Sequence, residues 1–454
     1  MSVGSDDDGF DAIDADEIRA ALAAEDARLT ECPWARPDHP LYFPTPNDDP
    51  VRRQALLRAA SAEATARLFG QHTFHTSSIV LTRADVAVLL QGWDGVDDSS
   101  TERAALISRV HSAIEAHVAA AHGEVTDGVF VRMTTRSPKD VPYLCEPWRT
   151  RLRDAFQRRR AASKDAMSPD AKLVALLSEA RALLRVRTGA EAVHLLASSP
   201  ALRLDLSSAI AAADGSKNNS QCEPCIVLRS WEAFDITSEL RVFVSRLTDP
   251  DEPSAGGGGE ASGGLASGVD RLSRVAWPSR GDPVRVTAIS PWFHFLNYAT
   301  LRHDGLAQTV LGNEELICEA LDRFVSEVVE RRLREANTAD PDADVLSASS
   351  YVLDVCIAPL DNAGAIPDDL AVVRVRNGPV ETPHRIRIVE INGFHPAVTA
   401  AKMFDWKRDA GTLCFGRRPT LRLRTHDDQA DLAQRLTGVT AFPRDEVVTL
   451  LRDP

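Results

Sequence analysis

Two stretches near the end of the chain decide the fold: Tyr351-Val-Leu-Asp-Val-Cys-Ile357 and Arg385-Ile-Arg-Ile-Val-Glu-Ile-Asn-Gly-Phe394. Side chains alternate with period two in both, which predicts β-strands. The alternation places Asp354 on one face of the first strand, and Glu390 and Asn392 together on one face of the second. We therefore expect acidic and amide oxygens to converge at one place on a sheet.

These oxygens would suit a magnesium ion. A carboxylate among Val, Ile and Leu side chains costs several kcal/mol to bury unless a cation or hydrogen-bond donors meet it. Three oxygen ligands of this kind suit Mg²⁺, which keeps several waters and usually arrives with nucleotide phosphates. Arginines paired with Asp354 and Glu390 at the strand ends would explain the same residues, so both interpretations stay open at this point.

The composition limits the partners of the chain. Its 454 residues, 44% of them apolar, suffice for two or three domains or for one large domain with insertions. The net charge of −14 repels nucleic acid and anionic membranes, so we expect neither as a direct partner. The seven cysteines are an odd number and widely spread, and no apolar leader is visible, which predicts a cytoplasmic protein.

Cations come earlier in the chain than the acidic strands. The stretch Gly128–Asp140 is predicted as a short strand that runs into a loop, and it carries Arg132, Arg136 and Lys139. Guanidinium and ammonium groups in this arrangement suit a phosphate clamp, because they form charge-assisted hydrogen bonds to phosphate oxygens. A solvated polar loop is the alternative.

Two further strands are predicted in the middle of the chain, at Ile226–Trp231 and Glu239–Val244. Arg229 lies in the first, while Glu239 and Arg241 share one face of the second. A charged pair on one face of a strand points into a polar cleft or at solvent.

Amphipathic patterns predict helices between these strands. Thr82 begins a helix that extends to Leu90, with the threonine as its N-cap. A second helix covers 101–121. A third begins at Asn313 and carries one apolar stripe: Ile317, Leu321, Phe324 and Val328.

The predicted organisation has four parts. Residues 1–50 form an acidic, Pro-rich and partly disordered extension, and 51–160 form an N-terminal lobe. A helical and loop insertion covers 161–220. The C-terminal lobe, 221–454, contains a flexible Gly-rich insertion at 250–283.

Assembled in order, these motifs resemble the cell division cycle protein 123 family of ATP-grasp-like proteins. Gly128–Asp140 is similar to the family's VFPKLNWSxPKDA, Val227–Trp231 to VLRKW, and Glu239–Val244 to EFRCFV. Tyr351–Val355 resembles YVFDV, and Val389–Phe394 resembles IDFNPF. The chain departs from the family pattern at Arg132 for a lysine, at Glu390 for an aspartate, and at Pro291 and Trp292 for a glutamine and an arginine.

The resemblance implies an α/β (α+β) protein with an ATP-grasp-like, two-lobed fold and mainly antiparallel sheets, plus flexible insertions. By this match Mg²⁺ and ATP are the cofactors, and the site residues are Arg132, Lys139, Arg229, Glu239 and Arg241 around the nucleotide, with Asp354, Glu390 and Asn392 on the magnesium ion.

The resemblance also implies a role. Members of the family are ATP-binding assembly chaperones that join the subunits of eukaryotic translation initiation factor 2 by engaging its gamma subunit. We expect the same of this chain, acting as a monomer. An ATP-grasp ligase, which forms an acyl phosphate from a carboxylate substrate and ATP, is the alternative, because the same residues could serve phosphoryl transfer.

Overall fold

The structure is a computed structural model of the chain. It describes residues 50–93, 100–121, 128–163, 167–215, 224–248, 283–301, 305–336, 340–360, 369–377, 380–395, 399–425, 435–436, 447–448 and 451. The predicted acidic extension (1–50) and Gly-rich insertion (250–283) lie almost entirely outside the described residues.

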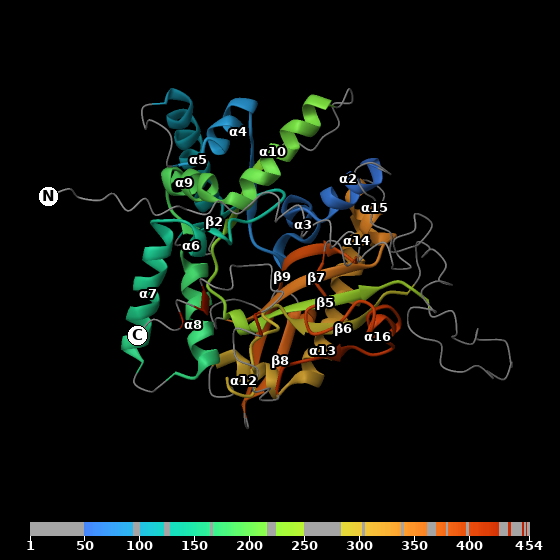
Figure 1. The fold of residues 1–454 in the computed structure, drawn as a ribbon. Coiled ribbons are helices and arrows are strands. Elements are labelled where there is room, and N and C mark those ends of the chain that lie inside the picture. Colours follow the sequence, from blue (N-terminus) through green and yellow to red (C-terminus); the bar gives the residue numbers. More distant parts are fainter. Residues whose placement is uncertain are drawn as a thin grey trace, which may run out of the picture.

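Within these ranges the strands form two sheets (Figure 1). The smaller has the order β1-β4-β2-β3 and is antiparallel throughout. Its strands are β1 (Thr76–Val80), β4 (Cys225–Ser230), β2 (Val129–Met133) and β3 (Arg185–Val186).

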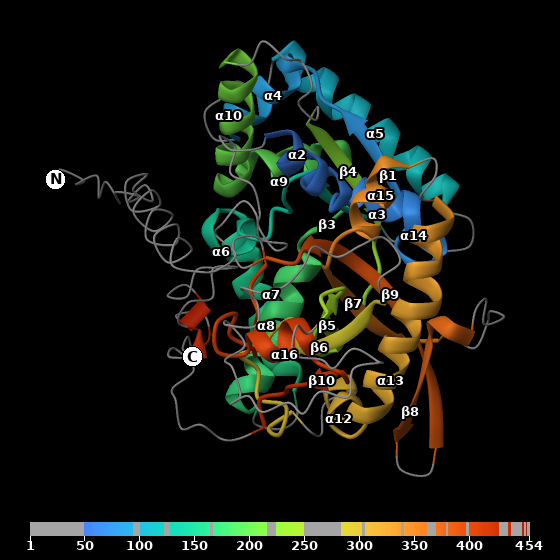
Figure 2. The ribbon, with the colours of Figure 1, turned by 90° about the vertical axis from the view of Figure 1, so that its right-hand side faces the viewer.

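The larger sheet has the order β10-β6-β5-β7-β9-β8 and curls into a half-barrel (Figure 2). All its pairings are antiparallel except that of β10 with β6. The predicted α+β fold with mainly antiparallel sheets is thus confirmed. The strands are β5 (Glu239–Ser245), β6 (Arg285–Pro291), β7 (Tyr351–Pro359), β8 (Val372–Asn377), β9 (Val380–Gly393) and β10 (Thr420–Leu421).

The smaller sheet has its own hydrophobic core, which α5 and α9 complete. The predicted cap of α4 is confirmed, since the side chain of Thr82 accepts from the backbone N–H of Asp85 and the Asp85 carboxylate accepts in return from Thr82. Four helices belong to this part of the fold: α4 (Arg83–Leu90), α5 (Thr101–Ala120), α9 (Gly189–Ser198) and α10 (Pro200–Gly215).

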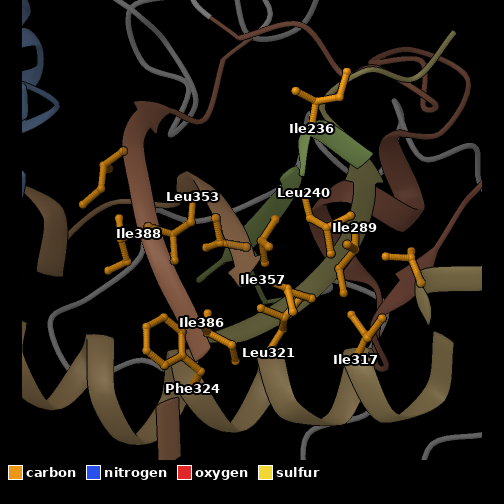
Figure 3. Close-up of a cluster of buried hydrophobic side chains, with 14 of the residues drawn as sticks. Ile236, Leu240, Ile289, Ile317, Leu321, Phe324, Leu353, Ile357, Ile386 and Ile388 are labelled. Atoms are coloured by element: carbon orange, nitrogen blue, oxygen red, sulfur yellow. The ribbon is translucent and has the colours of Figure 1, made fainter. Parts of the chain in front are cut away.

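One face of the larger sheet packs on α13 (Glu314–Phe324) (Figure 3). The predicted apolar stripe is confirmed, because all four of its residues are buried in this core. The helix continues through a π-helical segment, η4 (Val325–Val329), into α14 (Glu330–Ala336). Smaller elements border the sheet: α12 (Gly305–Leu311), α16 (Ala410–Phe415), η3 (Ile236–Ser238) and η5 (Asp369–Ala371).

The opposite face of the larger sheet is polar at one end. Strand alternation sends Leu240 and Val242 of β5 into the core on α13, so Glu239 and Arg241 lie on the other face together with Phe243. On β7, Leu353 and Val355 face the same core, so Asp354 points away from it.

The remaining helices connect the two sheets. Arg58 and Arg67 form ion pairs with Asp340 and Asp342, which fasten the first helices to α15. Elsewhere α8 packs beside α7 (Figure 1) and contributes Leu173, Leu176 and Leu177 to the core of the larger sheet. The bounds are α2 (Pro50–Ala59), α3 (Ala62–Phe69), η2 (Gly70–His72), α6 (Val141–Leu144), α7 (Trp148–Ala162), α8 (Pro169–Ala182) and α15 (Pro341–Ser347).

The domain boundaries stay a prediction, but the chain does not pass from one sheet to the other at residue 221. Strand β4 (Cys225–Ser230) lies between β1 and β2 in the smaller sheet, and β5 is the first strand of the larger sheet along the sequence.

Among the helices that the structure describes, none is long and apolar enough to cross a membrane.

Candidate functional site

A cleft lies where the two sheets meet. Strands β2 and β4 of the smaller sheet and β5 and β9 of the larger sheet all contribute side chains to it. Its aromatic lining consists of Phe74, Phe130, Tyr143, Trp231, Phe234, Trp292 and Phe293, and its charged lining of Arg132, Lys139, Arg181, Arg229, Glu232, Glu239 and Glu390.

An ion pair between Arg132 and Glu390 joins the sheets across this cleft. Arg132 Nη1 donates to Glu390 Oε1 over 2.9 Å, and the two side chains are 7% and 26% exposed. Burial alone would raise the pKa of Glu390, but the charges of Arg132 and Lys139 outweigh it and lower that pKa to about 2. Glu390 is therefore a carboxylate at neutral pH.

A row of charges crosses three strands of the larger sheet beside the cleft. In the sheet register Arg241 lies opposite Asp354, and Asp354 lies opposite Glu390. Arg241 donates to both Asp354 oxygens over 2.7 Å, and Asn392 Nδ2 donates to Oδ2 over 3.1 Å. Burial lowers the pKa of Arg241, but the adjacent Asp354 carboxylate more than compensates and raises it.

Arg229 is a buried cation without a carboxylate of its own among the described residues. Its guanidinium lies 4.7 Å from the ring centroid of Phe74 and donates through Nη2 to Thr73 Oγ1 over 3.2 Å. Its Nε has no hydrogen-bond partner within the described part of the chain. Burial, followed by the like charge of Arg132, lowers the pKa of Arg229 to about 10, so it remains charged at neutral pH.

Two lysines lie on one tryptophan at the edge of the cleft. The Lys139 and Lys402 ammonium groups are 4.5 and 4.1 Å from the ring centroid of Trp292. Burial, followed by the charge of Arg241, lowers the pKa of Lys402 to about 7.

Glu239 of β5 is another acidic group that lines the cleft. Burial raises its pKa, and its nearest cation is Arg181, whose Nη1 lies 3.8 Å from Oε2. Arg181 comes from α8 and stacks on Phe234, with 3.4 Å between the guanidinium carbon and the ring centroid.

The structure brings the eight predicted site residues to one region. Arg132, Lys139, Arg229, Glu239 and Glu390 line the cleft directly, whereas Arg241, Asp354 and Asn392 lie in the adjoining row. Their roles toward a nucleotide or metal stay a prediction. Sequence reasoning missed Arg181, Glu232 and Lys402, since none of them lies in an alternating strand pattern or a motif of the resemblance.

The predicted magnesium ligands already have partners within the protein. Asp354 accepts one hydrogen bond from Arg241 at Oδ1 and two, from Arg241 and Asn392, at Oδ2. Since each carboxylate oxygen has two lone pairs, Oδ1 keeps one that a metal ion could use. Glu390 and Asn392 are oxygen ligands of the kind Mg²⁺ prefers. Among the described residues no group of three His, Cys, Asp or Glu side chains could hold a metal ion on its own.

Fold and cleft together define a two-sheet α+β protein with a cation-lined cleft between the sheets. Comparison with family models gives a match to D123 over residues 168–248. This match confirms the resemblance to the Cdc123 family that the sequence motifs indicate.

Two solved structures are also similar to this chain. The chain is similar to a C-terminally truncated Cdc123 from Schizosaccharomyces pombe, with 18% identity and a TM-score of 0.42, over 83% of this chain and 98% of that one. It is also similar to Cdc123 from the same organism, with 17% identity and a TM-score of 0.41, over 82% and 97% of the two chains. Comparison with curated proteins gave no match.

The D123 match overlaps the segment that the sequence analysis describes as an insertion, residues 161–220, because it begins at residue 168. Two helices of this segment pack into the cores, since α8 contributes to the core of the larger sheet and α9 to that of the smaller one. The bounds of the insertion stay a prediction. The segment also supplies Arg181 to the cleft.

Proposed function

We propose that the cleft binds ATP with magnesium and that the chain is an ATP-binding assembly chaperone of eukaryotic translation initiation factor 2, acting through its gamma subunit. The observation that supports ATP binding is the convergence of Arg132, Lys139 and Arg229 on one cleft with aromatic walls. The assembly role is proposed from the match to D123 over residues 168–248 and from the resemblance of the motifs.

The cations of the cleft suit a polyanion. A buried guanidinium is costly unless an anion or acceptors meet it, and Arg229 Nε has no acceptor in the described part of the chain. Phosphate oxygens would supply acceptors to Arg229 and to Lys139 at the same time. A net charge of −14 makes such a local cluster necessary for any nucleotide to be held.

The aromatic walls suit the base of the nucleotide. Phe74, Phe130, Phe234 and Phe293 line the same cleft as the cations. Ligand sites are commonly apolar walls with a few well-placed polar groups, and aromatic rings stack on flat ligands in offset or edge arrangements.

In this proposal Glu390 and Asn392 would hold the magnesium ion. A bound Mg²⁺ neutralises part of the phosphate charge and orients the phosphates. Asp354 would keep Arg241 in place beside them, through the bidentate pair. Arg132, which bridges to Glu390, would fix the position of that carboxylate across the cleft.

The binding part of the proposal is tested by isothermal titration with ATP and magnesium. Arg229→Met should weaken ATP binding by about tenfold to a hundredfold, because one to two charge-assisted hydrogen bonds to phosphate are lost. Arg158→Met is the matched control, since Arg158 is exposed on α7 and this helix contributes no residue to the cleft lining. The ATP affinity of this variant should equal that of the wild type. Equal affinity of the wild type and Arg229→Met would contradict the site.

The assembly part is tested by a pull-down with the gamma subunit of the initiation factor, with and without Mg-ATP. Recovery that depends on Mg-ATP and is reduced by Arg229→Met is the expected result. If a carboxylic acid and an amine together stimulate the release of ADP, the ligase is favoured instead. In this proposal the chain works as a cytoplasmic monomer without nucleic acid or membrane, which gel filtration and cell fractionation check.

A further inference from the structure

Lys402 has a strained backbone. Its φ of 61° lies in the left-handed region, and it is the only residue other than glycine with a positive φ among those the structure describes. This conformation is unfavourable for a residue with a side chain, and such strain persists only where the surroundings fix the backbone.

The surroundings do fix it, from both sides. Before Lys402, the carbonyl oxygen of Ala400 accepts from Arg241 Nη1 over 2.8 Å. After it, the backbone N–H of Met403 donates to Ser290 Oγ over 3.1 Å. The indole N–H of Trp406 donates to the carbonyl of Thr399 over 2.9 Å, which closes the segment into a tight loop.

This conformation places the side chain on the edge of the cleft. The Lys402 ammonium lies 4.1 Å from the ring centroid of Trp292, which lines the cleft and which the Lys139 ammonium approaches to 4.5 Å. Neither ammonium has a carboxylate within 4.0 Å in the part of the chain that the structure describes. Two ammonium groups on one ring, neither in a close ion pair within the described part of the chain, indicate a place for an anionic group with more than one negative charge.

We propose that Lys402, paired with Lys139 on Trp292, binds the terminal phosphate of the ligand in the cleft. The inference rests on the proposed nucleotide site and assigns to it a residue from outside every motif of the sequence. It also gives Trp292 a role: the ring carries both ammonium groups at the position where the resemblance places an arginine in related chains.

The charge state of Lys402 follows from its neighbours. The charged and titratable groups that act on it are Arg241, Asp354, Lys139, Glu239 and His294. Because burial and Arg241 lower the pKa of Lys402 to about 7, this lysine is largely neutral at pH 8 without ligand. A phosphate group favours the ammonium form, so binding above pH 7 takes up a proton.

The experiment compares ATP, AMP and inorganic triphosphate by isothermal titration in the presence of magnesium. Lys402→Met should weaken ATP binding by about tenfold to a hundredfold and leave AMP binding within about twofold, because AMP has no terminal phosphate at this position. Lys407→Met, an exposed lysine five residues further on, is the matched control and should bind all three ligands like the wild type.

A pH series supplies a readout that a purely structural role would not change. Above pH 7 the ATP affinity of the wild type should fall by up to about tenfold per pH unit, since the proton must be taken up from solution. Lys402→Arg should restore tight binding and show no such fall, because arginine keeps its charge.

The outcomes separate this inference from the proposed function. If the wild type binds ATP but Lys402→Met binds it equally well, or loses ATP and AMP binding alike, the inference is wrong and the nucleotide site stands. If the wild type binds no nucleotide, the proposed function is wrong. Inorganic triphosphate then decides the inference: binding that Lys402→Met removes supports it, and absence of binding contradicts it.

Discussion

Each carboxylate of the charged row is held by a different arginine. Asp354 accepts from Arg241 within the larger sheet, whereas Glu390 accepts from Arg132 across the cleft. A buried pair contributes little net stability against an apolar replacement, but removal of one partner leaves an uncompensated buried charge. The row is therefore costly to keep unless its charges serve a ligand.

Glu390 gives a stability prediction with a defined pH window. Its pKa falls from 4.5 to about 2 on folding, so the carboxylate stabilises the protein above pH 4.5 and this contribution is lost as the pH falls toward 2. Glu390→Gln should lower the free energy of unfolding at pH 7 by about 3 kcal/mol. Urea denaturation at pH 7 and pH 3 checks this, and the difference from the wild type should shrink at pH 3.

The control for this prediction is Glu381→Gln, because Glu381 also pairs with an arginine, Arg376, but both side chains are more than half exposed. Its unfolding free energy should change by less than about 1 kcal/mol at either pH. A Glu390→Gln effect that is independent of pH would show that the charge of this carboxylate does not stabilise the fold.

At the scale of secondary structure, local patterns determine most of what is observed. Strand alternation predicted which face of β5, β7 and β9 carries the polar row, and the stripe beginning at Ile317 predicted the buried face of α13. The π-helical segment η4 was not predicted, because its residues continue the helical apolar pattern without a break. Arg181 reaches the cleft because α8 packs there, and Lys402 because the loop after β9 does. Such tertiary packing cannot be predicted from the periodicity of a single segment.

The contact between α5 and α9 gives a prediction for an element. A Cβ on Gly189, the first residue of α9, would lie 2.1 Å from the backbone carbonyl oxygen of Ile107 in α5. Because backbone cannot move aside as a side chain can, Gly189→Ala should destabilise the protein by about 1–3 kcal/mol or more. Thermal unfolding followed by circular dichroism measures this.

Gly312→Ala is the matched control, since a Cβ there would meet its nearest atom at 3.5 Å, an ordinary contact, and no strained φ is present. It should leave the unfolding temperature nearly unchanged. If Gly189→Ala unfolds at the same temperature as Gly312→Ala, the two helices are not packed as closely as the structure has them.

At the scale of the molecule, the two sheets have separate cores and meet at the cleft. Charged contacts link the sheets across it: Arg132 of β2 reaches Glu390 of β9, and Arg229 of β4 shares the ring of Phe74 with Arg387 of β9. An apolar cluster of Phe74 and Phe234 with Cys356 and Ala358 of β7 lies beside them. A ligand that contacts both walls of the cleft would add further contacts between the two sheets.

Hydrogen exchange with and without Mg-ATP tests this. A ligand that binds only the native state, at a concentration one hundred times its Kd, raises the free energy of unfolding by about 2.7 kcal/mol. The free energy of a local opening that breaks the ligand contacts rises by the same amount. Slower exchange is therefore expected in β2 and β4 of the smaller sheet and also in β9 of the larger one, whereas α4, on the far side of the smaller core, should be unaffected. Slower exchange in one sheet alone would mean that the nucleotide does not bridge the sheets.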